Sequence, residues 1–194
     1  MEIQGGWKMA TVTPKLVVPN RCLFPEIFKS LGYASGAEVG VLDGDLSIEL
    51  VRFGGNLFLV DAWRNVDGLI DENNPENAVH EARYQRVKAR FASYPQVIIR
   101  RGLSVDVSKT FQDGELDWVY LDADHRQVSV TADLNAWYPK VRVGGMLCGH
   151  DYFNPSGWET HQGVKAAVDE FFKGREVSLT SEFKYEHSWF IVKE

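Results

Sequence analysis

The chain has 194 residues, of which 44% are hydrophobic and 25% are charged, and its formal net charge is −6. This length suits one domain with a sizeable core, and the composition is that of a globular protein rather than a disordered one. The sequence contains no long basic run. Because binding to phosphates needs clustered Lys and Arg, we expect no nucleic acid as the main partner.

Two cysteines, Cys22 and Cys148, lie far apart in the sequence and form no CxxC motif. This usage predicts a reducing compartment, and therefore a cytoplasmic location. The first residues lack the apolar segment of a signal peptide, and no apolar run is long enough to cross a bilayer. We therefore expect no membrane span.

Residues 1–20 contain two glycines and two prolines without a clear hydrophobic period, and they are predicted to form an arm or lid. A short helix is expected over 25–32, because Pro25 suits the first turn of a helix and Gly32 suits its end. Residues 21–194 are expected to form one domain.

Strand and helix patterns alternate through the rest of the chain. Strands are expected at residues 37–41, 56–63, 96–102, 116–123 and 144–152, with helices at 46–53, 78–92, 104–111, 129–141 and 163–174. Segments 176–183 and 188–194 are expected to form a final hairpin. Apolar strands that alternate with helices indicate a parallel sheet covered on both faces. The predicted fold is therefore α/β, a Rossmann-like doubly wound, mostly parallel sheet with a C-terminal antiparallel hairpin.

A glycine turn follows the first strand, at the carboxyl edge where such sheets bind ligands. Gly40 and Gly44 allow the backbone to approach a ligand closely, with Glu38 before them and Ser47 after them. The fingerprint of dinucleotide-binding folds would require a glycine where this chain has Leu42. A tight turn that holds no ligand is the alternative.

Asp61 ends the second strand, where a carboxylate can accept hydrogen bonds from both hydroxyls of a ribose. The alternatives are a helix cap and a surface aspartate. Ala62 and Trp63 follow and are expected near an adenine ring, although Trp63 suits packing in the core equally well. After the third strand, Gly102 precedes Ser104, which is expected to cap the following helix.

Acidic and imidazole side chains follow the fourth and fifth strands. Asp122 and His125 are three residues apart at the end of the fourth strand, and His150 and Asp151 follow the fifth. The ordinary pKa of histidine makes His125 a suitable general base near neutral pH. A solvent-exposed position at the start of a helix is the alternative for His125.

Three motifs occur together and in order: E-x-G-x-x-x-G at 38–44, LDADH at 121–125 and GGMLCGHDY at 144–152. Together they resemble class I methyltransferases that use S-adenosylmethionine (SAM), in particular catechol-type and macrolide- or sugar-tailoring small-molecule O-methyltransferases. The resemblance runs over residues 24–194 and implies SAM as the cofactor. The residues implied in SAM binding are Glu38, Gly40, Gly44, Ser47, Asp61, Ala62, Trp63, Gly102, Ser104 and Asp122, and the resemblance implies that Gly102 and Ser104 border the adenine.

The resemblance also implies roles in catalysis. Asp122 would bind a divalent metal near the methionine amino group, His125 would take the proton of the acceptor hydroxyl, and Asp151 would complete the metal site. His150 departs from the family pattern, which has an Asp-Asn or an acidic pair at these two positions. Carboxylates suit Mg²⁺, whereas His150 as a ligand favours Mn²⁺, Fe²⁺ or Zn²⁺. The alternative is that His150 and Asp151 shape a pocket without a metal.

The predicted function is SAM-dependent O-methyl transfer to a hydroxyl of a small molecule, such as a sugar, a phenol or a natural product. The (D/N)PPY motif of enzymes that methylate nucleobases is absent after the fourth strand. Two alternatives stay open, a nicotinamide-dependent oxidoreductase on a Rossmann-like sheet and a catalytically silent domain that binds SAM.

Residues 1–20 and 64–77 are expected to cover the cofactor or the acceptor, since mobile loops commonly exclude water from transfer reactions. Three side chains beyond the fifth strand are candidates for the acceptor site, namely Phe153, Trp158 and His161. His80, on a predicted helix, is expected at the surface.

Overall fold

The computed structural model describes residues 16–67, 73–152, 162–181 and 187–194. The strands within these residues are β1 (Ser35–Val39), β2 (Asn56–Asp61), β3 (Val97–Arg101), β4 (Leu116–Leu121), β5 (Val141–Gly149), β6 (Ser178–Leu179) and β7 (Trp189–Val192). They form one sheet in the order β3-β2-β1-β4-β5-β7-β6. The first five strands are parallel, and β7 is antiparallel to β5 and β6. The expected doubly wound, mostly parallel sheet with an antiparallel C-terminal pair is confirmed.

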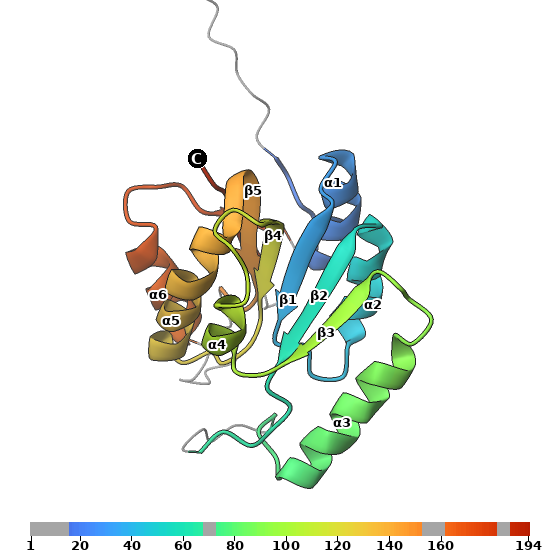
Figure 1. The fold of residues 1–194 in the computed structure, drawn as a ribbon. Helices are drawn as coiled ribbons and strands as arrows, with labels where there is room; N and C mark the ends of the chain where they lie inside the picture. The colour runs from blue at the N-terminus through green and yellow to red at the C-terminus, as the bar shows by residue number, and fades with distance from the viewer. Residues whose placement is uncertain (1–15, 68–72, 153–161, 182–186) are drawn as a thin grey trace, which may run out of the picture.

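The helices are α1 (Phe24–Ser30), α2 (Asp45–Leu50), α3 (Asn77–Arg90), α4 (Ser104–Ser108), α5 (Gln127–Trp137) and α6 (Gln162–Phe171). Figure 1 shows α1, α2 and α3 on one side of the sheet and α4, α5 and α6 on the other. Each predicted element is present, with boundaries shifted by a few residues. The expected helix at 46–53, for example, is α2 followed by the 3-10 turn Val51–Phe53. None of the helices in the described parts of the chain has the length and apolarity needed to span a membrane.

Successive side chains of β4 point to opposite faces of the sheet and are buried in the core on each face. Trp118 and Tyr120 are buried in the cluster that contains α1, whereas Val119 and Leu121 are buried in the cluster that contains α5 and α6. On the α1 face, Trp118 stacks on Phe28 with ring centroids 4.4 Å apart. Because helices close both faces, a ligand can reach the sheet only at the strand ends.

The carboxyl ends of β1 and β4 approach each other at Gly40. Gly40 adopts a φ of +92°, and a Cβ atom there would lie 1.9 Å from the carbonyl oxygen of Asp122. The Asp122 amide donates a hydrogen bond to the Val39 carbonyl at 2.7 Å. Only glycine fits so close a backbone approach at a positive φ. This contact lies between the two halves of the sheet, where the strand order reverses.

Glu38 in β1 is a carboxyl group in the protein interior. It is 2% exposed, and the hydroxyl of Ser47 in α2 donates a hydrogen bond to it. Burial raises the pKa of Glu38 to about 8. Glu38 therefore joins β1 to α2 as a neutral acid at neutral pH.

Gly40→Ala should destabilise the fold, because a methyl group would meet the Asp122 carbonyl in addition to the strain of a positive φ. The strain alone costs about 1–2 kcal/mol, so the free energy of unfolding should fall by more than about 2 kcal/mol. Gly32→Ala is the matched control, since Gly32 has a φ of +69° and no atom within 4 Å of a Cβ there. Urea unfolding measures both variants. If both variants lost the same free energy of unfolding, the close approach of the backbone at Gly40 would be contradicted.

Glu38 should make the free energy of unfolding fall as the pH rises from about 4.5 to about 8. In this window the folded state holds the Glu38 proton while the unfolded chain releases it, because the pKa of about 8 in the folded state exceeds the ordinary 4.5. Glu38→Gln keeps an acceptor for Ser47 and removes the titration, so its stability profile should be flatter. Urea unfolding across the window checks this, and parallel profiles would mean that Glu38 is charged in the folded protein.

Candidate functional site

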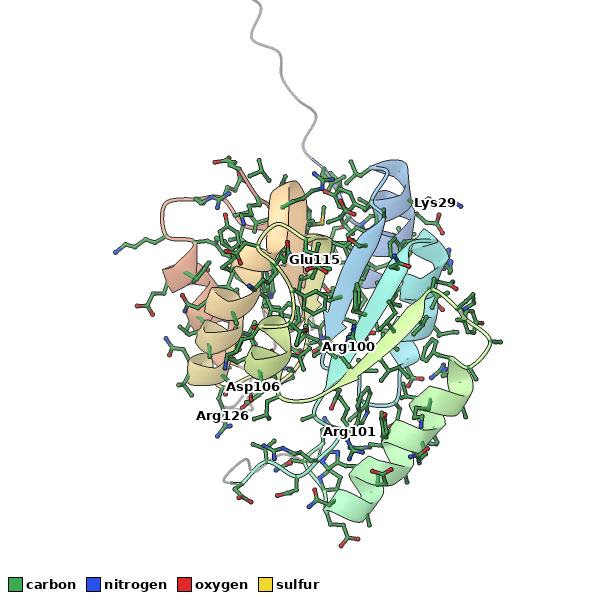
Figure 2. The ribbon with its side chains drawn as sticks, in the orientation of Figure 1. Lys29, Arg100, Arg101, Asp106, Glu115 and Arg126 are labelled. Carbon is green, nitrogen blue, oxygen red and sulfur yellow. The ribbon has the colours of Figure 1, made fainter. Side chains whose placement is uncertain are left out.

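A cavity of about 870 Å³ lies at the carboxyl edge of the sheet. Its walls come from the turn after β1, the ends of β2 and β4, the start of α4, and the residues that follow β5. Figure 2 shows two lining residues, Asp106 and Arg126, at this end of the molecule, with Glu115 before β4 toward the opposite end. Cavities of about 300–1,000 Å³ commonly hold small-molecule ligands.

Most of the sequence-predicted site residues meet in this cavity. Its lining includes Glu38, Gly40, Asp61, Ala62, Trp63, Ser104, Asp122, His125, His150 and Asp151. Three others lie behind the lining. Gly44 is the N-cap residue of α2, with a φ of +80°, and the hydroxyl of Ser47 in α2 donates a hydrogen bond to the carboxyl of Glu38. The Gly102 amide donates a hydrogen bond to the Asp61 carbonyl at 2.9 Å, next to the lining residues at the end of β2.

The Asp61 carboxylate holds the turn after β1. Its Oδ2 accepts hydrogen bonds from the amides of Val41 and Leu42 at 2.9 and 3.0 Å. Its Oδ1 accepts one from the amide of Trp63 at 2.7 Å. A carboxylate offers about four acceptor positions. Asp61 can therefore fix this turn and still accept a hydrogen bond from a ligand in the cavity.

Trp63 is only 1% exposed although it borders the cavity. Its indole nitrogen donates a hydrogen bond to the Leu42 carbonyl at 2.9 Å, and its ring lies 5.1 Å from the ring of Tyr84. Of the two roles predicted for Trp63, packing in the core is the one that these contacts support.

The expectation that Ser104 caps α4 is wrong. Leu103 is the N-cap residue and makes no side-chain capping bond, and Ser104 is the first residue of the helix. The Ser104 hydroxyl instead donates to Oδ1 of Asp133 at 2.5 Å and accepts a hydrogen bond from Nε1 of Trp137 at 2.8 Å. Both partners belong to α5, 29 and 33 positions further along the chain. A tertiary contact has thus replaced the local capping bond.

Four side chains gather where β4 and β5 end. The Nε2 of His125 lies 3.1 Å from Oδ2 of Asp151 and 3.4 Å from Oδ1 of Asp122. The Nδ1 of His150 lies 3.3 Å from Oδ2 of Asp151 and 3.9 Å from Oδ1 of Asp122. Asp151 is 5% exposed and adopts a φ of +53°. Such a positive φ is uncommon for a residue with a side chain. The side chain of Asp151 lies among the four.

The spacing of these atoms fits a divalent metal ion. Donor atoms of Asp122, His125 and Asp151 all lie within 4.8 Å of one another. Adjacent ligands bound about 2.1 Å from one ion are about 3.0–3.4 Å apart in octahedral or tetrahedral coordination. The distances of 3.1, 3.3 and 3.4 Å around the carboxylates fall in that range, whereas the 3.9 Å between His150 and Asp122 lies above it. Mixed carboxylate and imidazole donors suit Mn²⁺, Fe²⁺ or Zn²⁺ better than Mg²⁺.

His150 lies beside both carboxylates, and Arg21 lies beside Asp122. Burial opposes the charged form of His150, but the hydrogen bond to Asp151 and the charge of Asp122 outweigh it and raise the pKa of His150. Arg21 places its Nη1 3.8 Å from Oδ2 of Asp122. Arg21 is not among the site residues predicted from the sequence, because nothing in the local sequence connects it with the strand ends.

The expectation that His80 lies at the surface is wrong. His80 is 6% exposed and lines the cavity from α3. Burial and the charge of Arg83 lower its pKa, and its Nε2 has no hydrogen-bond partner among the described residues. His80 and Val87 are the buried residues of α3. Their spacing of two helical turns was the available sequence signal for an inward face.

Some expected features fall outside the described residues. These are residues 1–15 of the expected arm, 68–72 of the expected cover, and the acceptor-site candidates Phe153, Trp158 and His161. The end of the expected arm is described, and there Val18 is fully buried in the same core cluster as Phe24. The arm, the cover and the division at residue 20 stay predictions.

Comparisons with known proteins were made for both sequence and structure. A family model described as a methyltransferase domain matches residues 37–152. No curated protein matches the chain in sequence. Among solved structures, a Staphylococcus aureus protein assigned as a caffeoyl-CoA O-methyltransferase superposes with a TM-score of 0.66 at 14% identity, over 92% of this chain and 85% of that one.

Two further structures are similar. An O-methyltransferase from Bacillus cereus in complex with S-adenosylhomocysteine (SAH) has a TM-score of 0.62 at 19% identity, over 93% of this chain and 84% of that one. The O-methyltransferase NovP has a TM-score of 0.61 at 20% identity, over 90% of this chain and 78% of that one. At such identities these structures establish a shared fold, and fold alone does not determine function.

The family match carries more weight than the structural similarity. It covers more than half of the chain, from within β1 to the residues after β5. It therefore includes the glycine turn, Asp61 and the group formed by Asp122, His125, His150 and Asp151. The chain belongs to the methyltransferase domain family.

Proposed function

We propose that this protein is a SAM-dependent O-methyltransferase that acts, with a divalent metal, on a hydroxyl group of a small molecule. The observation that carries the proposal is that one cavity connects Asp61 with Asp122, His125 and Asp151. A methyl donor bound at Asp61 and a hydroxyl bound at Asp122, His125 and Asp151 would therefore meet in the same cavity. Family membership supports methyl transfer, and the imidazole and carboxylate side chains gathered at the strand ends suit a hydroxyl group as the acceptor.

When bound, SAM would supply the methyl group to the acceptor oxygen, with attack in line with the departing sulfur. The carbon–sulfur bond would break, SAH would be released as a neutral thioether, and the imidazole of His125 would take the hydroxyl proton. Orientation of the two reactants lowers the barrier, because a bimolecular step becomes effectively unimolecular. An alcohol ionises poorly at neutral pH, so a positioned base adds typically about 10²–10⁴-fold.

Asp122, His150 and Asp151 are proposed to hold the metal. A bound divalent ion would lower the pKa of the acceptor hydroxyl. The side chain of His125 is 18% exposed and that of His150 is 7% exposed. The more accessible imidazole is assigned to the acceptor and the more buried one to the metal. His125 is also placed to bind one metal ion together with Asp122 and Asp151. The competing assignment is therefore that His125 binds the metal and His150 acts as the base.

Two other functions remain distinguishable by their ligands. A nicotinamide-dependent oxidoreductase is disfavoured by Leu42, which stands where the dinucleotide fingerprint requires glycine, and by the family match. A catalytically silent domain would have no need for imidazoles and carboxylates gathered beside the cofactor site. Calorimetry with SAM and NAD tests the first alternative, and turnover on hydroxylated acceptors tests the second.

Asp61→Ala should weaken SAH binding about 30- to 150-fold, since a charged contact to the ribose worth about 2–3 kcal/mol is lost. Asp61 also binds three backbone amides, so damage to the turn has to be separated from ribose recognition. An SAH analogue without the ribose hydroxyls makes this separation. Wild type should bind it weakly, whereas Asp61→Ala should bind it as well as SAH. Equal binding of both ligands by wild type, measured by calorimetry, would remove Asp61 from the ribose site.

His125→Ala should lower kcat about 10²–10⁴-fold and leave SAH affinity nearly intact, because it removes a base and no cofactor contact. His150→Ala should instead weaken Mn²⁺ binding, measured by direct titration, by at least about 10-fold. Turnover is measured on an acceptor found by screening hydroxylated small molecules, with and without a chelator, which should inhibit wild type.

Each part of this assignment can fail separately. Loss of Mn²⁺ binding in His125→Ala, with binding retained in His150→Ala, would exchange the roles of the two histidines. Turnover that is insensitive to the chelator would refute the metal and leave the base in place. Full turnover in His125→Ala would refute the base.

A further inference from the structure

A chain of three polar side chains leads from α5 to the wall of the cavity. Nε1 of Trp137 donates to the Ser104 hydroxyl, which donates to Oδ1 of Asp133. A hydroxyl has one hydrogen to donate, and that of Ser104 is used on Asp133. Ser104 therefore fixes the orientation of the Asp133 carboxyl rather than offering its own hydrogen to a ligand.

Asp133 is a buried acid that the proposed reaction does not use. It is 7% exposed, it lines the cavity, and burial raises the pKa of its carboxyl to about 6. A carboxyl group in the interior costs free energy unless its oxygens are bonded. Oδ1 of Asp133 accepts the hydrogen bond from Ser104. A ligand in the cavity with a hydrogen to donate would complete the bonding of this group.

The cavity wall includes apolar side chains next to Ser104 and Asp133 in the sequence. Leu103 and Val105 are 38% and 37% exposed and line the cavity beside Ser104, and Ala132 lines it beside Asp133. Ligand sites combine apolar walls with a few polar groups that fix orientation. Apolar side chains beside the carboxyl of Asp133 fit a flat heteroaromatic ring that carries an amino group.

The strand order places this region at the adenine end of a bound nucleoside. Along the carboxyl edge, the order β3-β2-β1-β4-β5 puts Asp61 of β2 between the residues after β3 and the group that follows β4 and β5. With the ribose at Asp61 and the methyl group near Asp122 and Asp151, the base extends toward β3. Ser104, which holds Asp133, is the third residue after β3.

We propose that Asp133 recognises the adenine of the cofactor by accepting a hydrogen bond from its exocyclic amino group, and that Ser104 and Trp137 position the carboxyl for this. The inference rests on the proposed function, since it requires a SAM-type ligand in the cavity. It makes Asp133 the residue that selects adenine over a base with a carbonyl oxygen at the same position. A carboxylate facing that oxygen would be repelled and left unpaired.

The test compares SAH with S-inosylhomocysteine, in which a carbonyl oxygen replaces the amino group. Wild type should prefer SAH by about 10- to 100-fold in Kd, the range expected for a hydrogen bond to a charged group. Asp133→Asn has both a donor and an acceptor, so the preference should fall to about one. The ratio of the two affinities cancels any general loss of binding, and thermal melting confirms that the variant is folded.

Asp124→Asn is the matched control. Asp124 lines the same cavity, but both of its oxygens are already bonded, to Arg126 and to Ser129. Its replacement should leave the preference for SAH unchanged. A lost preference in Asp124→Asn together with a retained one in Asp133→Asn would overturn the inference.

The outcomes separate this inference from the proposed function. No binding of SAH by wild type would overturn both. Binding of SAH by wild type without a preference over S-inosylhomocysteine would overturn the role of Asp133 alone. So would an Asp133→Asn variant that is folded and keeps the full preference.

Discussion

The close approach of β1 and β4 at Gly40 is the constraint on which the rest of the site depends. The Asp122 carbonyl occupies the space that a side chain on Gly40 would need, and the Asp122 amide bonds to Val39. This brings the Asp122 side chain next to the turn whose amides Asp61 binds. A ligand over Gly40 therefore meets bare backbone between two carboxylates, an arrangement that no strand could provide alone.

Charge balance governs the part of the cavity beyond that contact. Asp122 and Asp151 lie close together in a largely buried place, where an uncompensated charge is costly. The two carboxylates raise the pKa of His150, and Arg21 places a positive charge beside Asp122. A divalent ion would compete with a proton for the lone pair on the imidazole nitrogen of His150. Metal binding and protonation of His150 therefore oppose each other. Glu38, the third acid nearby, stays neutral at neutral pH and adds no further negative charge.

The sheet could be predicted from the sequence because alternation and strand ends are local properties. The position of Asp61 and Asp122 at the cavity could be predicted for the same reason, since each lies at the carboxyl end of a buried strand. His80 was misplaced because α3 is mostly polar, and one inward histidine in a polar helix resembles a surface residue. Ser104 was misassigned because capping rules consider only the adjacent backbone, whereas its partner Asp133 lies on another helix. Local sequence patterns therefore could not predict the contacts between elements that are distant in the sequence.

The same arrangement occurs twice in this site, a serine hydroxyl that donates to a buried carboxyl. Ser47 bonds to Glu38 between α2 and β1, and Ser104 bonds to Asp133 between α4 and α5. In both pairs burial raises the pKa of the acid, so each acid reduces stability unless its bonding is completed. Fixing one oxygen in advance limits the entropy lost when a ligand binds to the other. Rigid helices and strands carry both pairs, which suits a cofactor that must be held in one orientation for transfer in line with the acceptor.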